Sequence, residues 1–307
     1  MPDVMPLISV IMPTYGRSGF LKRAVASVLR QTYAPLELIV VDDNGEGTPA
    51  REQTTAALSE FAEDPRVRRI DNPVNLGGAL ARNAGIRAAR GAYVAFLDDD
   101  DEYLPDRLRR QEEWMAAREL DACVMDGATY DLQGRLVGEK RQRFPENPTR
   151  DNLLVAHMLY HLTGTNTLMF RTEALTAAGG FDDVPAGHEF FLMLKVIEKG
   201  LKVGYLPEIL VRNCTHDGGR ISMGDGKIRA QRLILEAKRR HFDLLTSSQK
   251  RLVLCRHYGG IFYVHYVKKR YLRAAWYLMR AVMCSPGDAR ELFAQKRGRL
   301  RRRGEGA

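Results

Sequence analysis

The chain has 307 residues, of which 45% are hydrophobic and 28% are charged. At roughly 150 residues per domain, this length allows about two domains, or one large α/β domain with an appendage, and the composition excludes collagen-like, low-complexity and wholly disordered proteins. The net charge of +9 is unevenly distributed, because residues 229–307 carry a net charge of +15 and residues 1–228 carry −6. The sequence therefore predicts a mildly acidic body and a strongly basic C-terminal segment.

The sequence lacks clear signals for secretion, membrane insertion and disulfide bonding. The chain does not begin with the basic region and long apolar segment that are typical of a secretory signal. No stretch approaches the roughly 18–20 apolar residues that span a bilayer. The four cysteines are scattered, without the spacing of a zinc site. We therefore expect a cytoplasmic protein with reduced thiols.

Strands and helices alternate over the first part of the chain. Short apolar runs predict strands at 7–12, 36–41, 67–70 and 92–97, and helical spacing predicts helices at 18–31, 49–62, 78–89 and 105–118. The first strand is expected to stop at Pro13. The alternation is typical of an α/β fold with a mostly parallel, doubly wound sheet flanked by helices.

The second part of the chain is more mixed. We expect a hairpin at 122–131 and 135–138 around Gly134, a strand at 167–170, a helix at 172–178, a helix at 188–199 and a strand at 202–206. From about residue 229 the pattern is helical almost to the end, with residues 296–307 frayed. The sequence thus predicts a domain over 1–225, with halves 1–120 and 121–225, and a basic helical extension over 226–307.

Three predicted strands end in polar residues: Pro13-Thr14-Tyr15, Asp42-Asp43 and Asp98–Asp101. The carboxyl ends of parallel strands meet at one edge of a sheet, where ligands of α/β proteins bind. We therefore expect the functional site at this edge.

Asp98-Asp99-Asp100-Asp101 is the first motif with chemical content. Four adjacent carboxylates at a strand end repel one another, and a divalent cation would relieve that repulsion. Carboxylate and phosphate oxygens form the usual environment of Mg²⁺ or Mn²⁺. The alternative is an acidic turn that only water solvates.

The second motif, residues 75–86, reads NLGGALARNAGI. Gly77 and Gly78 lead into a helix N-terminus that can approach an anionic group closely, and Arg82 and Asn83 lie one turn further on. The alternative is an ordinary glycine-rich turn. No GxGxxG follows a strand and no GxxxxGK[ST] is present, so dinucleotide-binding and P-loop functions lose their support.

The third motif is GGFD at residues 179–182, followed by GHEFFL at 187–192. Glu189 lies at the start of a predicted helix, where it could act as a general base on a substrate hydroxyl. The alternative is a glutamate that the helix dipole favours at this end.

Together these motifs resemble the family 2 glycosyltransferases, which have the GT-A fold. The resemblance covers roughly residues 7–222 and follows the family's order: ISVIMPTYGR, LELIVVDDN, NLGGALARNAGI, ARGAYVAFLDDDDEYLPDRL, GGFD and an acidic helix start. It implies an α/β GT-A fold, with a nucleotide-sugar-binding half, an acceptor half and a helical C-terminal extension. The implied activity is inverting transfer of a sugar from a nucleotide-diphosphate sugar, UDP- or dTDP-linked, to an acceptor hydroxyl in bacterial surface polysaccharide or glycoconjugate synthesis.

The resemblance also implies roles for residues at the first two strand ends. Thr14 and Tyr15 match positions that line the nucleotide base, and Pro13 is assigned to the same nucleotide-sugar site. Asp43 matches an aspartate that hydrogen-bonds a uracil- or thymine-type base. Asn75, in the NLGG segment, is assigned to the same nucleotide-sugar site.

The acidic run covers the family's DxD motif. Asp100 matches the ligand through which Mn²⁺ or Mg²⁺ bridges to the diphosphate. Asp98 and Asp99 match positions near the ribose and the metal, and Asp98 is the second predicted ligand. Arg82 and Asn83 match a polar pair under the donor site.

Glu189 aligns with the family's catalytic base. Family members usually have Glu-Asp where this chain has His188-Glu189, so the carboxylate is kept but extended by one methylene. Residues 216–222, HDGGRIS, resemble a loop in a subset of the family, in which His216 and Arg220 would close over the diphosphate or complete the metal site. The alternative is a glycine-rich surface loop. Thr165–Thr167 is a candidate acceptor-facing segment.

Two other functions are considered. A non-catalytic nucleotide- or glycan-binding module could keep this fold and lack the base, and His188-Glu189 is the feature in its favour. A nucleotidyltransferase also couples an α/β sheet to metal-binding carboxylates, but it would have a Gly- and Arg-rich phosphate loop after the first strand, which residues 13–17 do not supply.

The basic C-terminal segment has three interpretations. Clusters at 238–240, 268–270 and 301–303 alternate with apolar stretches at 260–264 and 274–279. The segment could be a packed helical appendage with solvated charges. It could also dock on an anionic membrane surface, which suits a glycan or lipid-linked acceptor and a peripheral position on the inner face of the cytoplasmic membrane. No recognised motif supports nucleic-acid binding.

Overall fold

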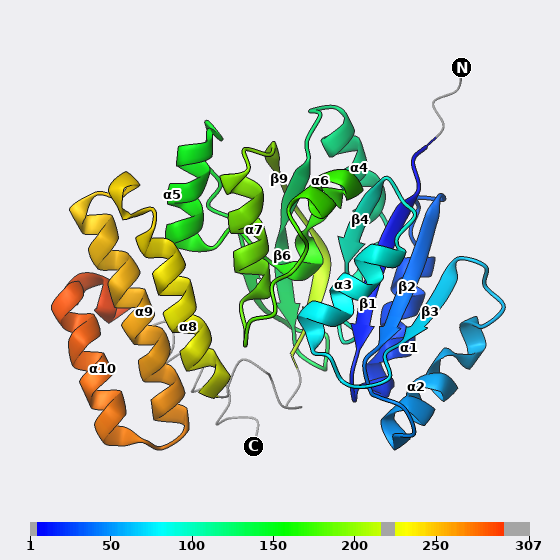
Figure 1. The fold of residues 1–307 in the computed structure, drawn as a ribbon, viewed down its shortest axis with the longest axis horizontal. Coiled ribbons are helices and arrows are strands. Elements are labelled where there is room, and N and C mark those ends of the chain that lie inside the picture. Colours follow the sequence, from blue (N-terminus) through cyan, green and yellow to red (C-terminus); the bar gives the residue numbers. More distant parts are fainter. Residues whose placement is uncertain (1–4, 216–224, 292–307) are drawn as a thin grey trace. The chain divides into compact units, whose positions relative to one another are not determined.

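The computed structural model describes residues 5–215 and 225–291 (Figure 1). The chain forms two compact units. The first unit comprises Met1–Leu153, Leu162–Asp183 and His188–His216, and the second comprises Leu154–His161, Val184–Gly187 and Asp217–Ala307.

Strands and helices alternate in the first half of the first unit, as predicted. Its elements are β1 (Ile8–Thr14), α1 (Ser18–Leu29), β2 (Leu36–Asp42), α2 (Pro49–Leu58), β3 (Val67–Asp71), α3 (Gly78–Ala88), β4 (Tyr93–Phe96), β5 (Glu102–Tyr103) and α4 (Arg107–Ala116). A short 3-10 helix, Ser59–Phe61, continues α2. The two-residue strand β5 was not predicted, since two residues carry no periodicity.

The remaining elements follow the predicted hairpin. They are β6 (Ala122–Tyr130), β7 (Leu136–Lys140), α5 (Arg150–Tyr160), a 3-10 turn (Thr165–Thr167), β8 (Met169–Arg171), α6 (Thr172–Ala177), α7 (His188–Glu198) and β9 (Val203–Cys214). The β6–β7 hairpin is antiparallel and confirms the prediction. Helix α5 was not predicted.

Two strands run further than their prolines suggested. β1 continues through Pro13 to Thr14. Its pairing with β4 ends at the pair Ile11 and Phe96, so the missing N–H of Pro13 leaves no carbonyl of β4 unpaired. β9 was predicted to end at Leu206, but it continues past Pro207. The register with β6 shifts there, from Leu206 opposite Met125 to Ile209 opposite Asp126, and such a bulge accommodates a proline.

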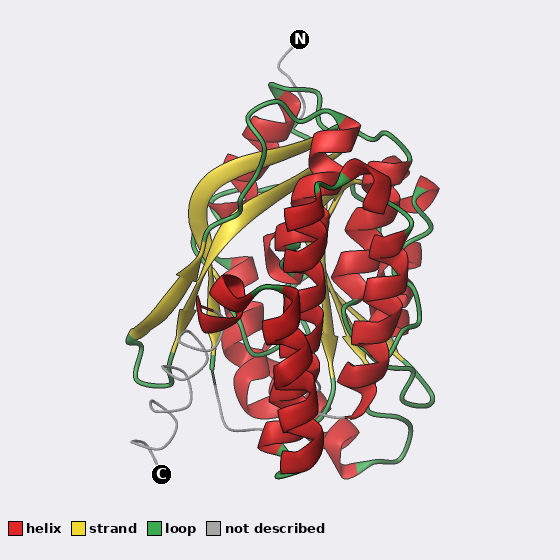
Figure 2. Ribbon diagram, turned by 90° about the vertical axis from the view of Figure 1, so that its left-hand side faces the viewer, coloured by secondary structure: helices red, strands yellow, loops and turns green. Residues whose placement is uncertain are grey.

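The strands form one mixed sheet in the order β3-β2-β1-β4-β8-β6-β9-β5, with β7 paired to β6. Neighbours from β3 to β4 are parallel, as predicted. β8 is antiparallel to both β4 and β6, and β9 is parallel to β6. Figure 2 shows the curvature of the strands. This arrangement confirms the α/β class with flanking helices.

Both faces of the parallel part are buried. Val10 and Met12 of β1 belong to the cluster that contains Leu21 and Val25 of α1. On the other face, α3 lies over β1 and β2 (Figure 1). Gly85 of α3 permits this approach, since a Cβ there would lie 2.4 Å from the Ile11 side chain. Burial on both faces explains why these strands are apolar throughout.

The second unit is helical, as predicted from about residue 229 onward. It contains residues 154–160 of α5, and α8 (Asp225–Arg239), α9 (Ser247–Val267) and α10 (Tyr271–Cys284). A capping box of Thr246 and Gln249 begins α9. No helix within the described ranges is long and apolar enough to cross a membrane. The frayed segment predicted at 296–307 lies outside the described residues.

Two cations of the second unit bind the C-terminal carbonyls of α5. Lys238 donates to the Met158 carbonyl and Arg256 donates to the Leu159 carbonyl. Positive groups at a helix C-terminus satisfy its unpaired carbonyls and favour its dipole. Burial, and to a smaller extent Arg256, lowers the pKa of Lys238 to about 7.

Lys238 is expected to make the free energy of unfolding rise with pH in the alkaline range. The unfolded side chain titrates near pH 10.4, so between about pH 7 and 10 the unfolded state binds more protons and stability rises with pH. Replacing Lys238 with methionine should remove a rise of roughly 1.4 kcal/mol per pH unit in this window. Denaturant unfolding of both proteins across that range measures it, with Lys250→Met as the control. A stability difference that stays constant with pH would contradict this expectation.

Candidate active site

The acidic run lies in the turn between β4 and β5. Oxygens of Asp98, Asp100 and Asp101 all lie within 4.8 Å of one another. The fourth carboxylate, Asp99, points elsewhere and accepts a hydrogen bond from the Thr14 hydroxyl at 2.7 Å. The structure therefore brings together Asp98 and Asp100, the two predicted metal ligands, and adds Asp101, to which the sequence assigned no role.

Two guanidinium groups offset the charge of this cluster. Arg17 Nη1 lies 2.7 Å from Asp100 Oδ2 and 3.7 Å from Asp99 Oδ1. Arg82, from the second turn of α3, pairs with Asp98. Arg82, which the resemblance places under the donor site, thus contacts the acidic turn through Asp98. Arg17 was not predicted, although it follows directly after the PTYG segment.

Asp99 joins the end of β1 to the end of β4. Its side chain is buried, and the backbone N–H of Tyr15 donates to it at 3.4 Å in addition to the Thr14 hydroxyl. Burial raises the pKa of Asp99 to about 7, while the bond from Thr14 acts in the opposite direction. Both predicted base-lining residues therefore contact the acidic turn, Thr14 as a buried residue and Tyr15 with an exposed side chain.

Asp101 is held by two groups from distant parts of the sequence. Its oxygens accept from the Cys214 backbone N–H at 2.6 Å and from the side-chain amide of Asn166. Asn166 also accepts from the Asp98 backbone N–H at 2.9 Å. Burial is the largest of the effects that raise the pKa of Asp101, followed by the charges of Asp98 and Asp100. Asn166, which the sequence offered only as acceptor-facing, thus fixes both ends of the acidic turn.

A buried arginine, Arg107, holds the segment that follows Asn166. Arg107 donates to the Leu168 carbonyl at 2.9 Å and lies 4.3 Å from the centre of the Tyr103 ring. The Tyr103 hydroxyl donates in turn to the Phe96 carbonyl at the end of β4. Arg107 is completely buried, which lowers its pKa. These contacts hold the acidic turn against rigid elements of the sheet.

Asp43 organises the loop that leads into α3. Its carboxylate accepts from the Leu76 N–H at 2.9 Å, the Gly77 N–H at 2.8 Å and the Asn72 side chain at 2.7 Å. Gly77 has a φ of +86°, which favours glycine at this turn. Asn75, an exposed residue of the loop, donates to the Asp43 carbonyl at 3.2 Å. A nucleotide base bound by Asp43 would use the same carboxylate oxygens that hold this loop in place.

Replacing Asp43 with asparagine is expected to lower the free energy of unfolding by about 1–3 kcal/mol, because an amide N–H would face buried N–H donors. Donor affinity should fall as well, since Asp43 is the residue expected to hydrogen-bond the nucleotide base. Denaturant unfolding and a donor titration measure the two effects. Asp71→Asn, an exposed aspartate at the end of β3, serves as the control. Unchanged stability of the Asp43 variant would contradict this role.

GGFD is clamped to α3 by Asn83. The Asn83 side chain donates to the Phe181 carbonyl at 2.8 Å and accepts from the Phe181 N–H at 2.9 Å. A Cβ at Gly180 would lie 2.6 Å from the Asn83 oxygen, so glycine is needed at this close approach. The Phe181 ring lies 5.8 Å from the Arg82 guanidinium. Asn83 therefore positions the segment that precedes α7.

Glu189 lies in the first turn of α7 and is partly exposed. Its charge acts on Lys140 of β7: loss of solvent lowers the pKa of Lys140, and Glu189 acts in the opposite direction. Lys140 donates to the Thr163 carbonyl, two residues before the 3-10 turn that carries Asn166. His216 and Arg220 lie outside the described residues.

The comparisons with known proteins agree with this architecture. The model of the family "Glycosyl transferase family 2" matches residues 9–175. The chain is 40% identical over 134 residues to the succinoglycan biosynthesis protein ExoO of Rhizobium meliloti, which is 43% of this chain and 36% of that protein. It is 37% identical over 105 residues to WfgD of Escherichia coli, named as a UDP-Glc:α-D-GlcNAc-diphosphoundecaprenol β-1,3-glucosyltransferase, covering 34% of this chain and 39% of WfgD. The alignments thus span less than half the length of these relatives.

A solved structure shares the fold across almost the whole chain. The S. aureus TarS structure of residues 1–349 in complex with UDP-GlcNAc aligns with a TM-score of 0.64 at 18% identity, covering 95% of this chain and 92% of that one. The family match covers more than half of the sequence, and it includes the strand ends and the acidic turn. The chain belongs to glycosyl transferase family 2.

Proposed function

We propose that the protein transfers a sugar from a nucleotide-diphosphate sugar to an acceptor hydroxyl, with inversion at the anomeric carbon. The observation that carries this proposal is the cluster of Asp98, Asp100 and Asp101 at the edge where β1, β2 and β4 end. ExoO and WfgD carry names from polysaccharide biosynthesis and glucosyl transfer, which supports placing the reaction in bacterial surface polysaccharide or glycoconjugate synthesis.

The three carboxylates fit a divalent cation. They offer hard oxygen ligands that lie within 4.8 Å of one another. Asp101 is buried beside the like charges of Asp98 and Asp100, and a bound cation would offset their repulsion. Asp100 and Asp98 would hold Mn²⁺ or Mg²⁺, and Asp101 joins them in this proposal. When bound, the ion supplies Lewis-acid stabilisation to the leaving diphosphate.

Residues around the cluster would bind and orient the donor. Arg17 and Arg82 already face the carboxylates, so a diphosphate bound there would lie within reach of two guanidinium groups. Thr14 and Tyr15 at the end of β1, together with the Asp43 loop, would receive a uracil- or thymine-type base, and Pro13 would belong to the same nucleotide-sugar site. UDP-linked donors in the name of WfgD and in the TarS complex support this choice of nucleotide.

Glu189 would act as the general base. It takes the proton of the acceptor hydroxyl while the acceptor oxygen forms a bond to the anomeric carbon. The bond from that carbon to the diphosphate oxygen breaks, and its electron pair leaves with the nucleoside diphosphate. His216 and Arg220 would close over the diphosphate from the 216–222 segment. WfgD is named for a diphosphoundecaprenol acceptor, which supports a lipid-linked glycan as acceptor. An acceptor of that kind would hold the protein at the inner face of the cytoplasmic membrane.

A panel of nucleotide sugars tests this function. Thermal shift with manganese is expected to identify one donor that stabilises the protein, and loss of that shift with a chelator would show that the ion is required. The selected donor should then be hydrolysed or transferred. Donor binding without any turnover would favour the non-catalytic module, and release of pyrophosphate from a nucleoside triphosphate would favour a nucleotidyltransferase.

A further inference from the structure

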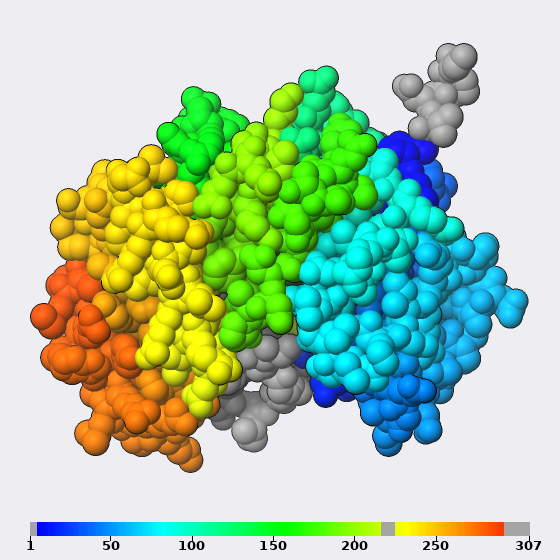
Figure 3. All heavy atoms as spheres, viewed as in Figure 1, coloured from blue at the N-terminus to red at the C-terminus, as the bar shows by residue number. Residues whose placement is uncertain are grey.

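Helix α10 has an apolar stripe on its outward face. Leu272, Trp276, Met279 and Met283 are 91%, 55%, 43% and 75% exposed. Their spacing of four, three and four residues places them on one side of a helix with 3.6 residues per turn. Figure 3 shows α10 (orange to red) at the surface of the second unit. Single exposed apolar residues are ordinary, but a continuous stripe marks an interaction surface.

The opposite face of α10 is already used for folding. Ala274 and Ala281 are buried, and Ala281 packs in a cluster with Cys255 and Tyr258 of α9. The exposed stripe is therefore not needed to attach α10 to its own unit. Arg273 and Arg280 flank the stripe at a spacing of seven residues, which places two cations along one of its borders.

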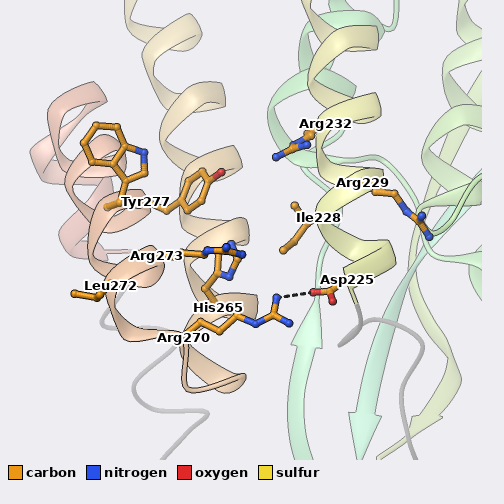
Figure 4. Close-up of a pocket in the computed structure, with 10 residues that line it drawn as sticks. Asp225, Ile228, Arg229, Arg232, His265, Arg270, Leu272, Arg273 and Tyr277 are labelled. Atoms are coloured by element: carbon orange, nitrogen blue, oxygen red, sulfur yellow. Dashed lines mark hydrogen bonds and ion pairs between the residues drawn. The ribbon is translucent and has the colours of Figure 1, made fainter.

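A basic pocket of about 660 Å³ lies beside the stripe. It is lined by residues of α8, α9 and α10, among them Arg229, Arg232, Arg270 and Arg273 (Figure 4). In Figure 4 the side chains of Arg232, Arg270 and Arg273 point toward the space between α8 and α10. Leu272 and Trp276 line the same pocket, so it is continuous with the apolar stripe.

The pocket has more positive charge than its own acid can neutralise. Asp225 is its single carboxylate, and this group already pairs with Lys268 at 2.8 Å and Arg270 at 3.1 Å. Within residues 5–215 and 225–291, Arg229, Arg232 and Arg273 form no ion pair. Such a concentration of exposed guanidinium groups attracts an anion.

His265 adds a buried polar group to the wall of the pocket. The residue is 4% exposed, and its ring stacks on Tyr277 with centroids 5.5 Å apart. Its Nδ1 has no hydrogen-bond partner among the described residues. Burial first, and then the neighbouring Arg270 and Arg273, lower the pKa of His265. An anionic group in the pocket would satisfy this histidine and the arginines together.

We propose that the second unit docks on an anionic phospholipid bilayer through α10, with the stripe of Leu272, Trp276, Met279 and Met283 at the acyl boundary and a lipid phosphate in the basic pocket. Apolar residues beside exposed cations are the pattern of helices that lie in the membrane interface, and tryptophan prefers this interface. The inference deepens the membrane contact in the proposed function, because it names the surface that makes that contact.

Charge favours this occupant over the alternatives. A second copy of the chain would bring the same basic surface against itself, and residues 292–307 are also strongly basic, so both would be repelled. A nucleic acid would match the charge but would leave the exposed Leu272 and Met283 in contact with polar phosphates. A bilayer with anionic lipids matches the charges and the apolar stripe at once.

Vesicle binding of the full chain tests the inference. Tryptophan fluorescence reports contact at the stripe, because the chain has two tryptophans and Trp114→Phe leaves Trp276 as the single reporter. Vesicles of phosphatidylcholine with one third phosphatidylglycerol are expected to shift the Trp276 emission to the blue and to bind at least tenfold more tightly than phosphatidylcholine alone. High salt should weaken the binding.

Two variants separate the stripe from the pocket. Leu272→Ser with Met283→Ser removes apolar contact, and Arg232→Gln with Arg273→Gln removes charge from the pocket. Each double variant is expected to weaken vesicle binding by tenfold or more. For the arginine pair this follows from about 1 kcal/mol per basic group near an anionic membrane surface. The controls are Leu132→Ser with Leu136→Ser, which are similarly exposed on the β6–β7 hairpin, and Arg135→Gln with Arg141→Gln.

The outcomes are distinct. Vesicle binding that the stripe and pocket variants lose, with folding and donor-induced thermal shift retained, supports the inference. Equal binding to both vesicle types, no binding by the wild type, or variants that bind like the wild type would overturn it. Preference for duplex DNA over vesicles, unchanged by the stripe variant, would also overturn it. Loss of the donor shift in the wild type would instead contradict the proposed function and leave the vesicle result to stand separately.

Discussion

Replacing Asp100 with asparagine is expected to abolish manganese-dependent donor binding and to slow transfer by a factor on the order of 10²–10³. Asp100 is one of three carboxylates whose oxygens lie within 4.8 Å of one another, and it pairs with Arg17 at 2.7 Å. An amide keeps the shape of the side chain but removes its charge, so the cation would lose a strong ligand. Calorimetric titration of the donor with manganese, and steady-state rates at saturating donor, measure the two effects.

The matched control is Asp64→Asn, which removes an aspartate that pairs with Arg66 in the loop before β3. It is expected to bind the donor and turn over like the wild type. Retention of manganese-dependent donor binding by the Asp100 variant, with the control unchanged, would exclude Asp100 as a ligand. The clearest support would be an Asp100 variant that binds the donor like the wild type without manganese and whose donor affinity does not increase when manganese is added.

Replacing Glu189 with glutamine is expected to lower kcat by a factor on the order of 10²–10⁴, the usual contribution of a general base. Donor affinity should change little, because Glu189 lies on α7, whereas the charges proposed to bind the donor come from the acidic turn, Arg17 and Arg82. The expected pattern is therefore a fall in kcat with donor binding retained, the reverse of the Asp100 variant. Rates and donor titration in the same buffer separate the two.

Glu198→Gln, at the last residue of the same helix, is the control for changes in α7 itself. It should keep full activity. An active Glu189 variant would remove the general base from the account. The replacement Glu189→Asp restores the carboxylate that the family usually carries at this position, and it should recover part of the rate that glutamine loses.

The strand ends were predictable because each depends on a local pattern. An apolar run followed by polar residues predicts where β1, β2 and β4 end, and parallel neighbours place those ends together. The contact between Thr14 and Asp99, residues 85 positions apart, follows from this arrangement. The sequence could therefore predict that these strand ends meet, and it named two of the three carboxylates that cluster there.

Other parts of the site depend on pairing between distant segments. The position of Asp101 depends on Cys214 of β9 and on Asn166, and no local pattern contains this information. The pairing of Arg17 with Asp100 likewise depends on how β1 meets β4. Asp43 was expected to bind a base, and the bonds from its carboxylate to Leu76 and Gly77 became visible only in three dimensions.

The extension of β9 and the strand β5 also escaped prediction for physical reasons. β9 continues past Pro207 because a bulge absorbs the missing N–H, and a bulge is defined by its partner strand rather than by its own sequence. The two residues of β5 are a strand only because Val211 and Arg212 of β9 lie opposite. Both cases place β9 next to the acidic turn, which is why the Cys214 N–H reaches Asp101.

The most direct test of the account is a crystal structure with manganese and the donor selected by the nucleotide-sugar panel, measured for the anomalous signal of manganese. The account predicts one manganese ion in contact with Asp100, at least one more carboxylate of the Asp98–Asp101 cluster and the donor diphosphate, with the base beside Tyr15 and the Asp43 loop. A bound donor whose diphosphate lies away from this cluster, or a manganese ion held by other residues, would contradict it.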